Sequence, residues 1–324
     1  MSEQLLTVVV NKREVQGKDV VVLELTAPDG QLLPEFDAGS HIDLHLSNGL
    51  VRQYSLCGDP AQQQSYRLGV LKDPNSRGGS QAVFDTLMPG VALEISAPRN
   101  LFPLTENSPK TILVGGGIGV TPMIAMAHRL HQLNQPFELW YCAHDRAECG
   151  FVDELQSAPF SDNVTCYFTT EHDGKRLDFN AVLADGVSAE KKLGAHLYVC
   201  GPDNFMQCVL DTAQALGYSD EQLHREYFSA EVETGGNSFE VVAAQSGITI
   251  RVEEDQTIAQ ALKAAGIKVP VACEQGTCGT CLCDVLEGTP DHRDVYLTDE
   301  EKEDNDQITL CCSRAKSARL VLDI

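Results

Sequence analysis

Four cysteines near the end of the 324-residue chain have the residue type and spacing of metal ligands. Cys273, Cys278 and Cys281 form a C-x4-C-x2-C run, and Cys311 follows after 29 further residues. A loop that binds zinc, or no metal, is the alternative, but zinc sites usually pair one C-x2-C with a second close pair. One run with a distant partner favours an iron–sulfur cluster, because two irons need four thiolates.

The same spacing resembles that of plant-type [2Fe–2S] ferredoxins. Gly276 and Gly279 lie inside the run, where glycine lets the backbone bend and present N–H groups to the sulfurs. Cys312 competes with Cys311, and only one of them can face the irons if the two are neighbours in a strand. The resemblance favours Cys311, and Cys283 and Cys312 are then expected to be small buried side chains.

Two motifs in the first hundred residues have the composition of an anion site. They are Arg52-Gln53-Tyr54-Ser55 and Arg77-Gly78-Gly79-Ser80. The second is expected to open a helix that runs to Leu87, so its N–H groups and the helix dipole would favour a phosphate. By themselves, a Gly-Gly pair before a helix can be only a turn, and Arg52 can be a solvated strand residue.

These motifs lie among six short predicted strands, which suggest a small antiparallel β-barrel. The strands are predicted at residues 7–10, 20–25, 42–46, 51–56, 66–71 and 92–96. Together the two motifs resemble the flavin-binding barrel of the ferredoxin reductase superfamily. The resemblance implies that Tyr54 and Ser55 flank the isoalloxazine ring and that Gly69 and Val70 line its edge. It also implies a set of residues around the flavin phosphate: Arg52, Arg77, Gly78, Gly79 and Ser80.

From residue 107 the chain alternates strands and helices, which predicts a Rossmann-like nucleotide domain. Strands are predicted at residues 111–114, 137–142, 164–168 and 196–200, and a last helix begins near Asp203. A glycine-rich loop follows the first strand and leads into a helix. Thr121 is the predicted N-cap of that helix, and Pro122 lies in its first turn.

The glycine-rich loop departs from the G-x-G-x-x-G fingerprint, because Val120 stands where the third glycine is expected. The loop resembles instead the pyridine-nucleotide loop of ferredoxin reductases, and Cys200-Gly201-Pro202 resembles the second motif of that family. The resemblance implies a nucleotide-binding set: Gly116, Gly117, Gly119, Thr121, Pro122, Gly201 and Pro202. It also implies that Cys200 lies near the path of the hydride, although alone this residue is more simply a core thiol at a strand end.

Two further positions concern the nicotinamide nucleotide. The resemblance implies that the last aromatic residue of the segment 224–228 packs on the flavin face where nicotinamide must displace it. That residue is Phe228, with Tyr227 as the neighbouring alternative. Asp145 would accept from the 2′-hydroxyl of NADH and repel a 2′-phosphate, whereas Arg146 would favour NADPH. NADH is the predicted cofactor.

The last part of the chain predicts a β-grasp ferredoxin. A hairpin is predicted at 239–243 and 248–252, then a helix capped by Thr257, the cysteine loop, a strand at 283–286 and an acidic helix at 297–306. The order of flavin barrel, nucleotide domain and ferredoxin is similar to that of the phthalate dioxygenase reductase family. The likeness includes two further segments, Asp291-His292-Arg293-Asp294 and Ser313-Arg314-Ala315-Lys316.

The expected fold is therefore multidomain, with α+β and α/β parts. The predicted domains are residues 1–106 for the flavin barrel, 107–230 for the nucleotide domain and 239–324 for the ferredoxin, with a short flexible hinge at 231–238. The family uses FMN, so FMN is preferred to FAD.

The net charge of −23 makes nucleic acid an improbable partner and favours a protein with a basic patch. Residues 239–324 contain 16 Asp and Glu against 8 Lys and Arg. The acidity can also serve solubility alone. Twelve cysteines without a disulfide pattern fit a reducing cytoplasm, and no signal peptide or membrane-spanning apolar run is visible.

Electron counting decides the predicted function. A hydride carries two electrons and a [2Fe–2S] centre accepts one at a time, so the flavin must lie between them. The prediction is an NADH-dependent reductase that passes single electrons to a separate Rieske non-haem iron oxygenase or demethylase. The alternatives are a self-contained NADH:acceptor oxidoreductase and a non-enzymatic redox or metal sensor.

Overall fold

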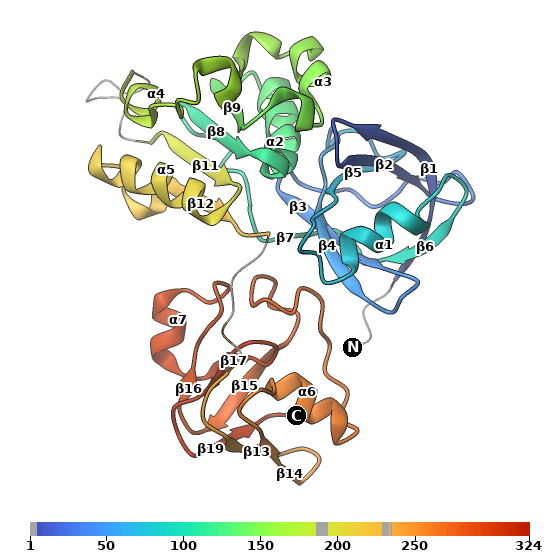
Figure 1. Ribbon diagram of the computed structural model, residues 1–324, viewed down its shortest axis with the longest axis vertical. Helices are drawn as coiled ribbons and strands as arrows, with labels where there is room; N and C mark the ends of the chain where they lie inside the picture. Colours follow the sequence, from blue (N-terminus) through green and yellow to red (C-terminus); the bar gives the residue numbers. More distant parts are fainter. Residues whose placement is uncertain (1–4, 186–193, 229–232, 234) are drawn as a thin grey trace. The chain divides into compact units, whose positions relative to one another are not determined.

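A computed structural model describes residues 5–185, 194–228, 233 and 235–324 of the chain. The chain divides into two compact units, Met1–Glu226 and Tyr227–Ile324. Figure 1 shows a β-barrel and a sheet flanked by helices in the first unit, and a smaller mixed sheet in the second. In the described part of the chain, no helix has the length and apolarity needed to cross a membrane.

The first part of unit one is an antiparallel β-barrel. Its strands are β1 (Leu6–Gln16), β2 (Val20–Thr26), β3 (Ser40–His45), β4 (Val51–Ser55), β5 (Tyr66–Leu71), β6 (Ala92–Ile95) and β7 (Arg99–Asn100). The order is β4-β3-β6-β1-β2-β5, with β7 paired to β3, and a bridge between Leu56 and Leu68 joins the two end strands. The six predicted strands are confirmed. The first strand runs on to Gln16 through a bulge after Val10, and β7 was not predicted.

A short helix, α1 (Gly79–Thr86), follows β5 and begins at the predicted motif. Its N-cap is Gly78, which has φ +92°, a left-handed conformation that favours glycine. The helix packs Ala82 and Val83 into the barrel core. The predicted helix start is therefore confirmed, with Leu87 as its C-cap.

The second part of unit one is a parallel five-stranded sheet. Its strands are β8 (Thr111–Gly116), β9 (Phe137–Ala143), β10 (Val164–Phe168), β11 (His196–Cys200) and β12 (Leu223–Glu226), in the order β10-β9-β8-β11-β12. The main helices are α2 (Val120–Gln132), α3 (Val152–Ser157), α4 (Phe179–Asp185) and α5 (Asp203–Ala215). β8 is buried along its whole length, as a strand covered on both faces must be.

The start of α2 differs from the prediction. Gly117–Gly119 form one turn of 3₁₀ helix, and Gly119 is the N-cap of α2. Thr121 is already inside the helix, and its hydroxyl donates to the Ile118 carbonyl at 2.9 Å. The prediction of Thr121 as N-cap is therefore wrong, because the compact turn starts the helix two residues earlier.

The second unit is a β-grasp ferredoxin fold. It contains β13 (Phe239–Ala243), β14 (Ile248–Val252), α6 (Ile258–Ala264), β15 (Leu282–Glu287), β16 (Pro290–Asp291), α7 (Asp299–Asp304), β17 (Gln307–Thr309), β18 (Arg314–Ala315) and β19 (Arg319–Leu322). The main sheet has the order β14-β13-β19-β15-β17, and β16 pairs with β18. Helix α6 packs Ile258, Ala261 and Leu262 against the sheet. Thr257 caps α6 as predicted, with its hydroxyl accepting from Gln260 N.

Two predictions for this unit need correction. The acidic helix is shorter than 297–306, because Thr298 is its N-cap and Asn305 ends it in a left-handed conformation. Cys311 and Cys312 lie in a turn between β17 and β18 and not in a strand. The alternation argument for choosing between them therefore does not apply.

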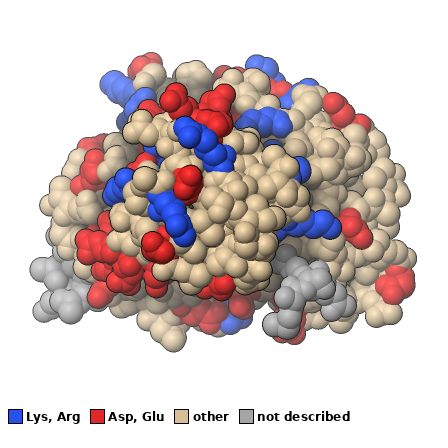
Figure 2. Space-filling model, turned by 90° about the horizontal axis from the view of Figure 1, so that it is seen from below, with Lys and Arg blue, Asp and Glu red and all other residues tan. Residues whose placement is uncertain are grey.

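Acidic side chains outnumber basic ones in the sequence, with 47 Asp and Glu against 24 Lys and Arg. Acidic side chains occur over much of the face shown in Figure 2, with basic ones interspersed and broad uncharged areas between them. Helix α7 places Asp299, Glu300 and Glu301 in its first turn, where the helix dipole favours negative charge.

Candidate functional site

The four predicted metal ligands come together in the second unit. Cys273, Cys278, Cys281 and Cys311 are all 7% exposed or less. The Cys273 thiol contacts those of Cys278 and Cys311, and the Cys311 thiol also contacts that of Cys281. These contacts lower the pKa of Cys273 and raise the pKa of Cys278 and of Cys311, because one thiolate is stabilised by protonated neighbours. Four thiolates at this spacing need compensating cations, which the irons of a cluster supply.

The loop around these sulfurs is shaped for close approach. Gly276 has φ +71° and a Cβ on it would lie 2.6 Å from the Cys312 sulfur, while a Cβ on Gly279 (φ +67°) would meet the Tyr296 ring at 2.2 Å. The Gln275 N–H donates to the Cys273 sulfur (3.4 Å), and the Thr280 N–H donates to the Cys278 sulfur (3.5 Å). The glycines thus provide the bend, and their neighbours provide the N–H groups.

No group of three or more His, Cys, Asp or Glu side chains, among the residues described, converges as the ligands of a single metal ion do. A two-iron cluster does not require such convergence, since its four thiolates surround two metal centres. The buried thiol set, its glycine bends and its N–H donors therefore fit a [2Fe–2S] cluster.

The structure separates the two neighbouring cysteines. Cys312 is buried, and its sulfur contacts the hydroxyls of Thr309 (3.2 Å) and Ser313 (3.8 Å). The Cys312 sulfur also contacts the thiol of Cys311. Cys283 is only half-buried, with its sulfur 3.6 Å from the Asp284 carbonyl, so the expectation of a buried side chain holds for Cys312 alone.

The two predicted flavin motifs are neighbours in the barrel. Arg52 lies on β4 and its side chain crosses Gly79, so closely that a Cβ there would lie 2.7 Å from the Arg52 Cγ. The Arg52 guanidinium also donates to the Val51 carbonyl at 2.8 Å. A guanidinium and the N-terminus of α1 therefore lie together, which suits a phosphate. The Ser80 hydroxyl accepts from Asp73 N at 3.2 Å and so also holds the preceding loop.

The remaining predicted flavin residues are mostly enclosed. Gly69 on β5 lies against Phe151 and Thr121, where a Cβ would approach within 2.5 Å and 2.9 Å. Val70 is 1% exposed, and burial raises the pKa of Tyr54 to about 12. Barrel strand β5 therefore packs closely on the nucleotide part of unit one. The roles of these residues toward flavin stay predictions.

The candidate nucleotide loop follows β8, the strand at which the order of strand addition in the parallel sheet reverses. β9 and β10 extend from one side of β8, whereas β11 and β12 lie on the other. In such sheets ligands bind at the carboxyl ends of the strands at this switch point. Gly119 follows β8, Gly201 follows β11, and a Cβ on Gly119 would lie 2.3 Å from the Cys200 carbonyl oxygen. The two predicted nucleotide motifs are therefore packed together, while Gly117 (φ +57°) has open space around its Cα.

Sequence reasoning missed one carboxylate at this place. The Ser55 hydroxyl donates to Glu226 Oε2 at 3.1 Å, across 171 residues of sequence. Glu226 ends β12 and pairs in register with Cys200 of β11. Burial raises the pKa of Glu226 to about 8, and the pKa of the buried Cys200 thiol lies well above its usual value. The barrel, Cys200 and this carboxyl group thus meet in one unit.

The two residues predicted to distinguish NADH from NADPH, Asp145 and Arg146, are both held by neighbouring groups. Arg146 pairs with Glu171 through Nε–Oε1 (2.7 Å) and NH2–Oε2 (3.3 Å), and stacks 4.6 Å over the Phe168 ring. Asp145 Oδ1 accepts from Ala147 N at 2.9 Å. A 2′-phosphate would have to displace Glu171 and approach Asp145, so the arrangement favours NADH.

Removing both carboxylates is expected to weaken this preference. In Asp145→Asn/Glu171→Gln, Arg146 becomes available to a 2′-phosphate, and the ratio of kcat/KM for NADPH to that for NADH should rise by on the order of 10-fold. Steady-state reduction of ferricyanide with each nucleotide measures the ratio. Glu148→Gln, on the same 3₁₀ turn, is the matched control. An unchanged ratio in the double variant would exclude these two carboxylates as the selectivity determinants.

Phe228 lies at the start of the second unit and is 40% exposed. The expected stacking of its ring on flavin stays a prediction.

Comparisons with known proteins match both the nucleotide part and the cysteine-containing part of the chain. A model described as "2Fe-2S iron-sulfur cluster binding domain" matches residues 241–316, and one described as "Oxidoreductase NAD-binding domain" matches residues 113–211. The chain is 50% identical over 322 residues to vanillate O-demethylase oxidoreductase of Pseudomonas sp. strain HR199, covering 99% of this chain and 100% of the relative. It is 37% identical over 315 residues to phthalate dioxygenase reductase of Burkholderia cepacia, covering 96% and 95%. A solved structure of phthalate dioxygenase reductase superimposes with a TM-score of 0.78 at 36% identity, covering 99% of this chain and 98% of that one.

Proposed function

The chain belongs to the phthalate dioxygenase reductase family, and from this premise we propose that it supplies electrons to the oxygenase component of a vanillate O-demethylase. As a family member it is an NADH-dependent iron–sulfur flavoprotein and the reductase component of a multicomponent oxygenase system. The observation that carries the substrate assignment is the 50% identity to a vanillate O-demethylase oxidoreductase over essentially the full length of both chains.

The residues of unit one would bring NADH and FMN together. Bound FMN supplies the conversion of a hydride into single electrons, which the [2Fe–2S] centre then carries one at a time. We assign the FMN phosphate to Arg52, Arg77 and the turn Gly78-Gly79-Ser80, and the ring to Tyr54, Ser55, Gly69 and Val70. The proximity of Arg52 to Gly79 supports the phosphate assignment.

For NADH we assign the pyrophosphate to the loop Gly116-Gly117-Ile118-Gly119 and to the N-terminus of α2 with Thr121 and Pro122. Gly201 and Pro202 would support the nicotinamide, Cys200 would border the hydride path, and Phe228 would cover the ring until nicotinamide arrives. Asp145 would accept from the ribose. Buried Cys200 would keep water away from the reacting carbon.

The cluster ligands in this proposal are Cys273, Cys278, Cys281 and Cys311. Their mutual contacts and burial support the assignment. N–H donation from Gln275 and Thr280 to two sulfurs would favour the more negative, reduced state of the centre.

The proposed domain limits remain 1–106, 107–230 and 239–324, with a linker at 231–238. We place the protein in the cytoplasm, where free thiols stay reduced. None of the twelve cysteines, all of which lie in the described part of the chain, forms a disulfide, which supports this assignment.

Reconstitution with separate oxygenases tests the proposal. The purified holoprotein, NADH and the oxygenase component of a Pseudomonas vanillate O-demethylase should consume vanillate, followed by chromatography. The oxygenase component of a phthalate dioxygenase, assayed with phthalate under the same conditions, is the matched comparison. Equal or faster turnover with the phthalate system would contradict the substrate assignment. If neither oxygenase accelerated NADH oxidation, a self-contained NADH:acceptor oxidoreductase would be the better description.

A further inference from the structure

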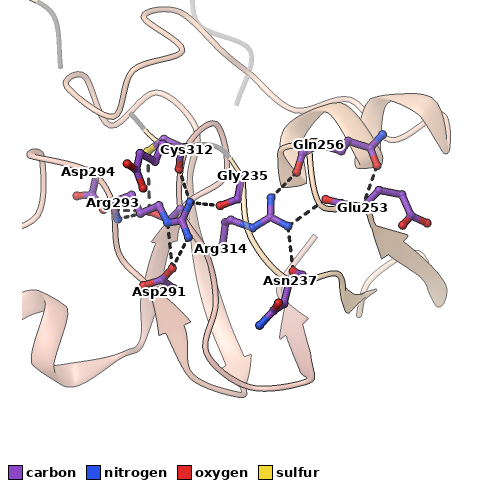
Figure 3. A network of polar contacts seen from close by, with 11 residues as sticks. Gly235, Asn237, Glu253, Gln256, Asp291, Arg293, Asp294, Cys312 and Arg314 are labelled. Carbon is purple, nitrogen blue, oxygen red and sulfur yellow. Dashed lines mark hydrogen bonds and ion pairs between the residues drawn. The ribbon is translucent and has the colours of Figure 1, made fainter. Parts of the chain in front are cut away.

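Two segments near the cluster loop have roles that the cluster itself does not explain. Residues 291–294 and 313–316 lie side by side, because β16 and β18 pair antiparallel with Asp291 opposite Arg314. Each segment contributes one arginine, Arg293 and Arg314, and Figure 3 shows both guanidinium groups directed toward the chain that enters the ferredoxin unit.

Arg314 is almost fully buried, with 2% of its surface exposed. Its NH2 donates to the Asn237 carbonyl (3.0 Å) and to the Glu253 carbonyl (3.0 Å), and its NH1 donates to the Gln256 carbonyl (2.8 Å). The guanidinium also lies 5.2 Å over the Phe239 ring. A single side chain therefore ties the chain just before β13 to the loop between β14 and α6 (Figure 3).

Arg293 binds the chain a few residues earlier. Its NH1 donates to the Gly235 carbonyl at 2.7 Å and to the Glu233 carbonyl. Asp291 orients this guanidinium by accepting from its Nε at 2.9 Å. The carboxylate therefore fixes the planar guanidinium so that one nitrogen, NH1, donates to both linker carbonyls.

Gly236 lies between the two arginines. Its N–H donates to the Glu254 carbonyl at 3.0 Å, and a Cβ on it would lie 3.0 Å from Arg314 Nε and 3.3 Å from Arg293 NH2. Glu233, Gly235, Gly236 and Asn237 are all exposed, so buried side chains do not hold them. The carbonyls of Glu233, Gly235 and Asn237 are bound by two arginines that come from 58 to 77 residues farther along the chain.

We propose that Arg293 and Arg314 are positioning residues for electron transfer, which hold the linker carbonyls of Glu233, Gly235 and Asn237 and thereby limit how far the ferredoxin unit can move from the flavin unit. The proposal rests on the proposed function. It differs from the flexible hinge that the glycine-rich composition predicts for these residues.

The limit follows from chain length. Unit one ends at Glu226, and Arg293 binds the carbonyl of Glu233, seven residues later. Seven residues span at most about 25 Å. Without Arg293, the next backbone group with a hydrogen bond to the ferredoxin unit, among the residues that the structure describes, is the Gly236 N–H, ten residues after Glu226. The effective concentration of a tethered partner falls roughly as the −3/2 power of tether length, so the loss is about twofold.

Arg293→Gln tests the proposal, with Arg319→Gln on β19, an exposed arginine of the same unit, as matched control. Hydrogen exchange followed by mass spectrometry should show faster exchange of the Gly236 amide in Arg293→Gln only. In stopped-flow with NADH, the flavin phase should be unchanged and the cluster phase about twofold slower. Cluster content by EPR should equal that of the unaltered protein.

A second variant separates tether length from local structure. Inserting three glycine or serine residues after Phe228 lengthens the chain from seven to ten residues while both arginines stay in place. This insertion should slow the cluster phase equally and leave Gly236 exchange unchanged. If Arg293→Gln fails to retain its cluster, the rate of the cluster phase in the insertion variant decides whether tether length controls electron transfer.

Unchanged Gly236 exchange in a cluster-containing Arg293→Gln would overturn the proposal, as would a cluster phase at the original rate in the insertion variant. Absence of cluster reduction by NADH in the unaltered protein would instead contradict the proposed function. In that case the exchange of Gly236 alone would decide whether the arginines hold the linker.

Discussion

Replacing Cys311 by serine should abolish NADH-dependent reduction of cytochrome c and leave reduction of the flavin by NADH intact. The Cys311 thiol contacts those of Cys273 and Cys281, so its loss removes one of four cluster ligands. The nucleotide loop and the flavin motifs are in the other unit. We expect cytochrome c reduction to fall by on the order of 100-fold or more. Stopped-flow bleaching of the flavin measures its reduction by NADH, and EPR of the reduced protein measures the cluster.

Cys312→Ser is the matched control for this experiment. The Cys312 sulfur contacts the hydroxyls of Thr309 and Ser313, and a serine there can keep comparable hydrogen bonds. The variant should therefore keep its EPR signal and most of its cytochrome c reduction. The opposite result, with Cys312→Ser inactive and Cys311→Ser active, would exchange the roles of the two cysteines and refute the ligand assignment.

The cysteine pair also shows where sequence reasoning stops. The spacing of Cys273, Cys278 and Cys281 is local, so one loop can be predicted to carry three ligands. The choice between Cys311 and Cys312 depended on an assumed strand, and the structure has a turn there. The resemblance selected Cys311, and the contacts of its thiol with those of Cys273 and Cys281 support that selection.

The sheets were predictable for a similar local reason. β8 is a continuous apolar run and β2 is rich in valine, so the pattern alone locates them. The start of α2 was misplaced because three residues of 3₁₀ helix leave no composition signal apart from glycine. Glu226 was missed because its partner Ser55 lies 171 residues away, and only the folded chain brings them together.

The linker at 231–238 shows most clearly what sequence composition cannot predict. Its composition of Gly, Thr and Asn indicates a flexible segment. The groups that Arg293 and Arg314 bind are backbone carbonyls, which every residue has and which leave no trace in composition. Both arginines were noted in the sequence, within two segments that resemble the family. Their binding to the linker carbonyls was not predicted.

Glu226→Gln should remove a pH dependence of stability from unit one. Burial raises the pKa of Glu226 from 4.5 to about 8, so the folded state holds a proton that the unfolded state releases. Its contribution to stability is complete below pH 4.5 and is lost as the pH rises to about 8. Glutamine keeps the neutral form at every pH. At pH 9 the free energy of unfolding of the variant should therefore exceed that of the original protein by on the order of 2–4 kcal/mol. At pH 5 the two free energies of unfolding should be similar.

Apparent melting temperatures of the holoprotein between pH 5 and pH 9 measure this difference, with Glu94→Gln, an exposed glutamate of the barrel, as control. Ser55→Ala sharpens the test, because the Ser55 hydroxyl donates to Glu226 Oε2 and lowers the pKa of this carboxyl. Its loss should move the fall in stability to higher pH. Parallel pH profiles for the original protein and Glu226→Gln would mean that the carboxyl group is solvated and ionised in the folded chain. A neutral carboxyl group at Glu226, next to Cys200, would keep negative charge away from the incoming nucleotide at neutral pH. Ionisation of Glu226 should therefore reduce NADH affinity above pH 8 in the original protein and not in Glu226→Gln.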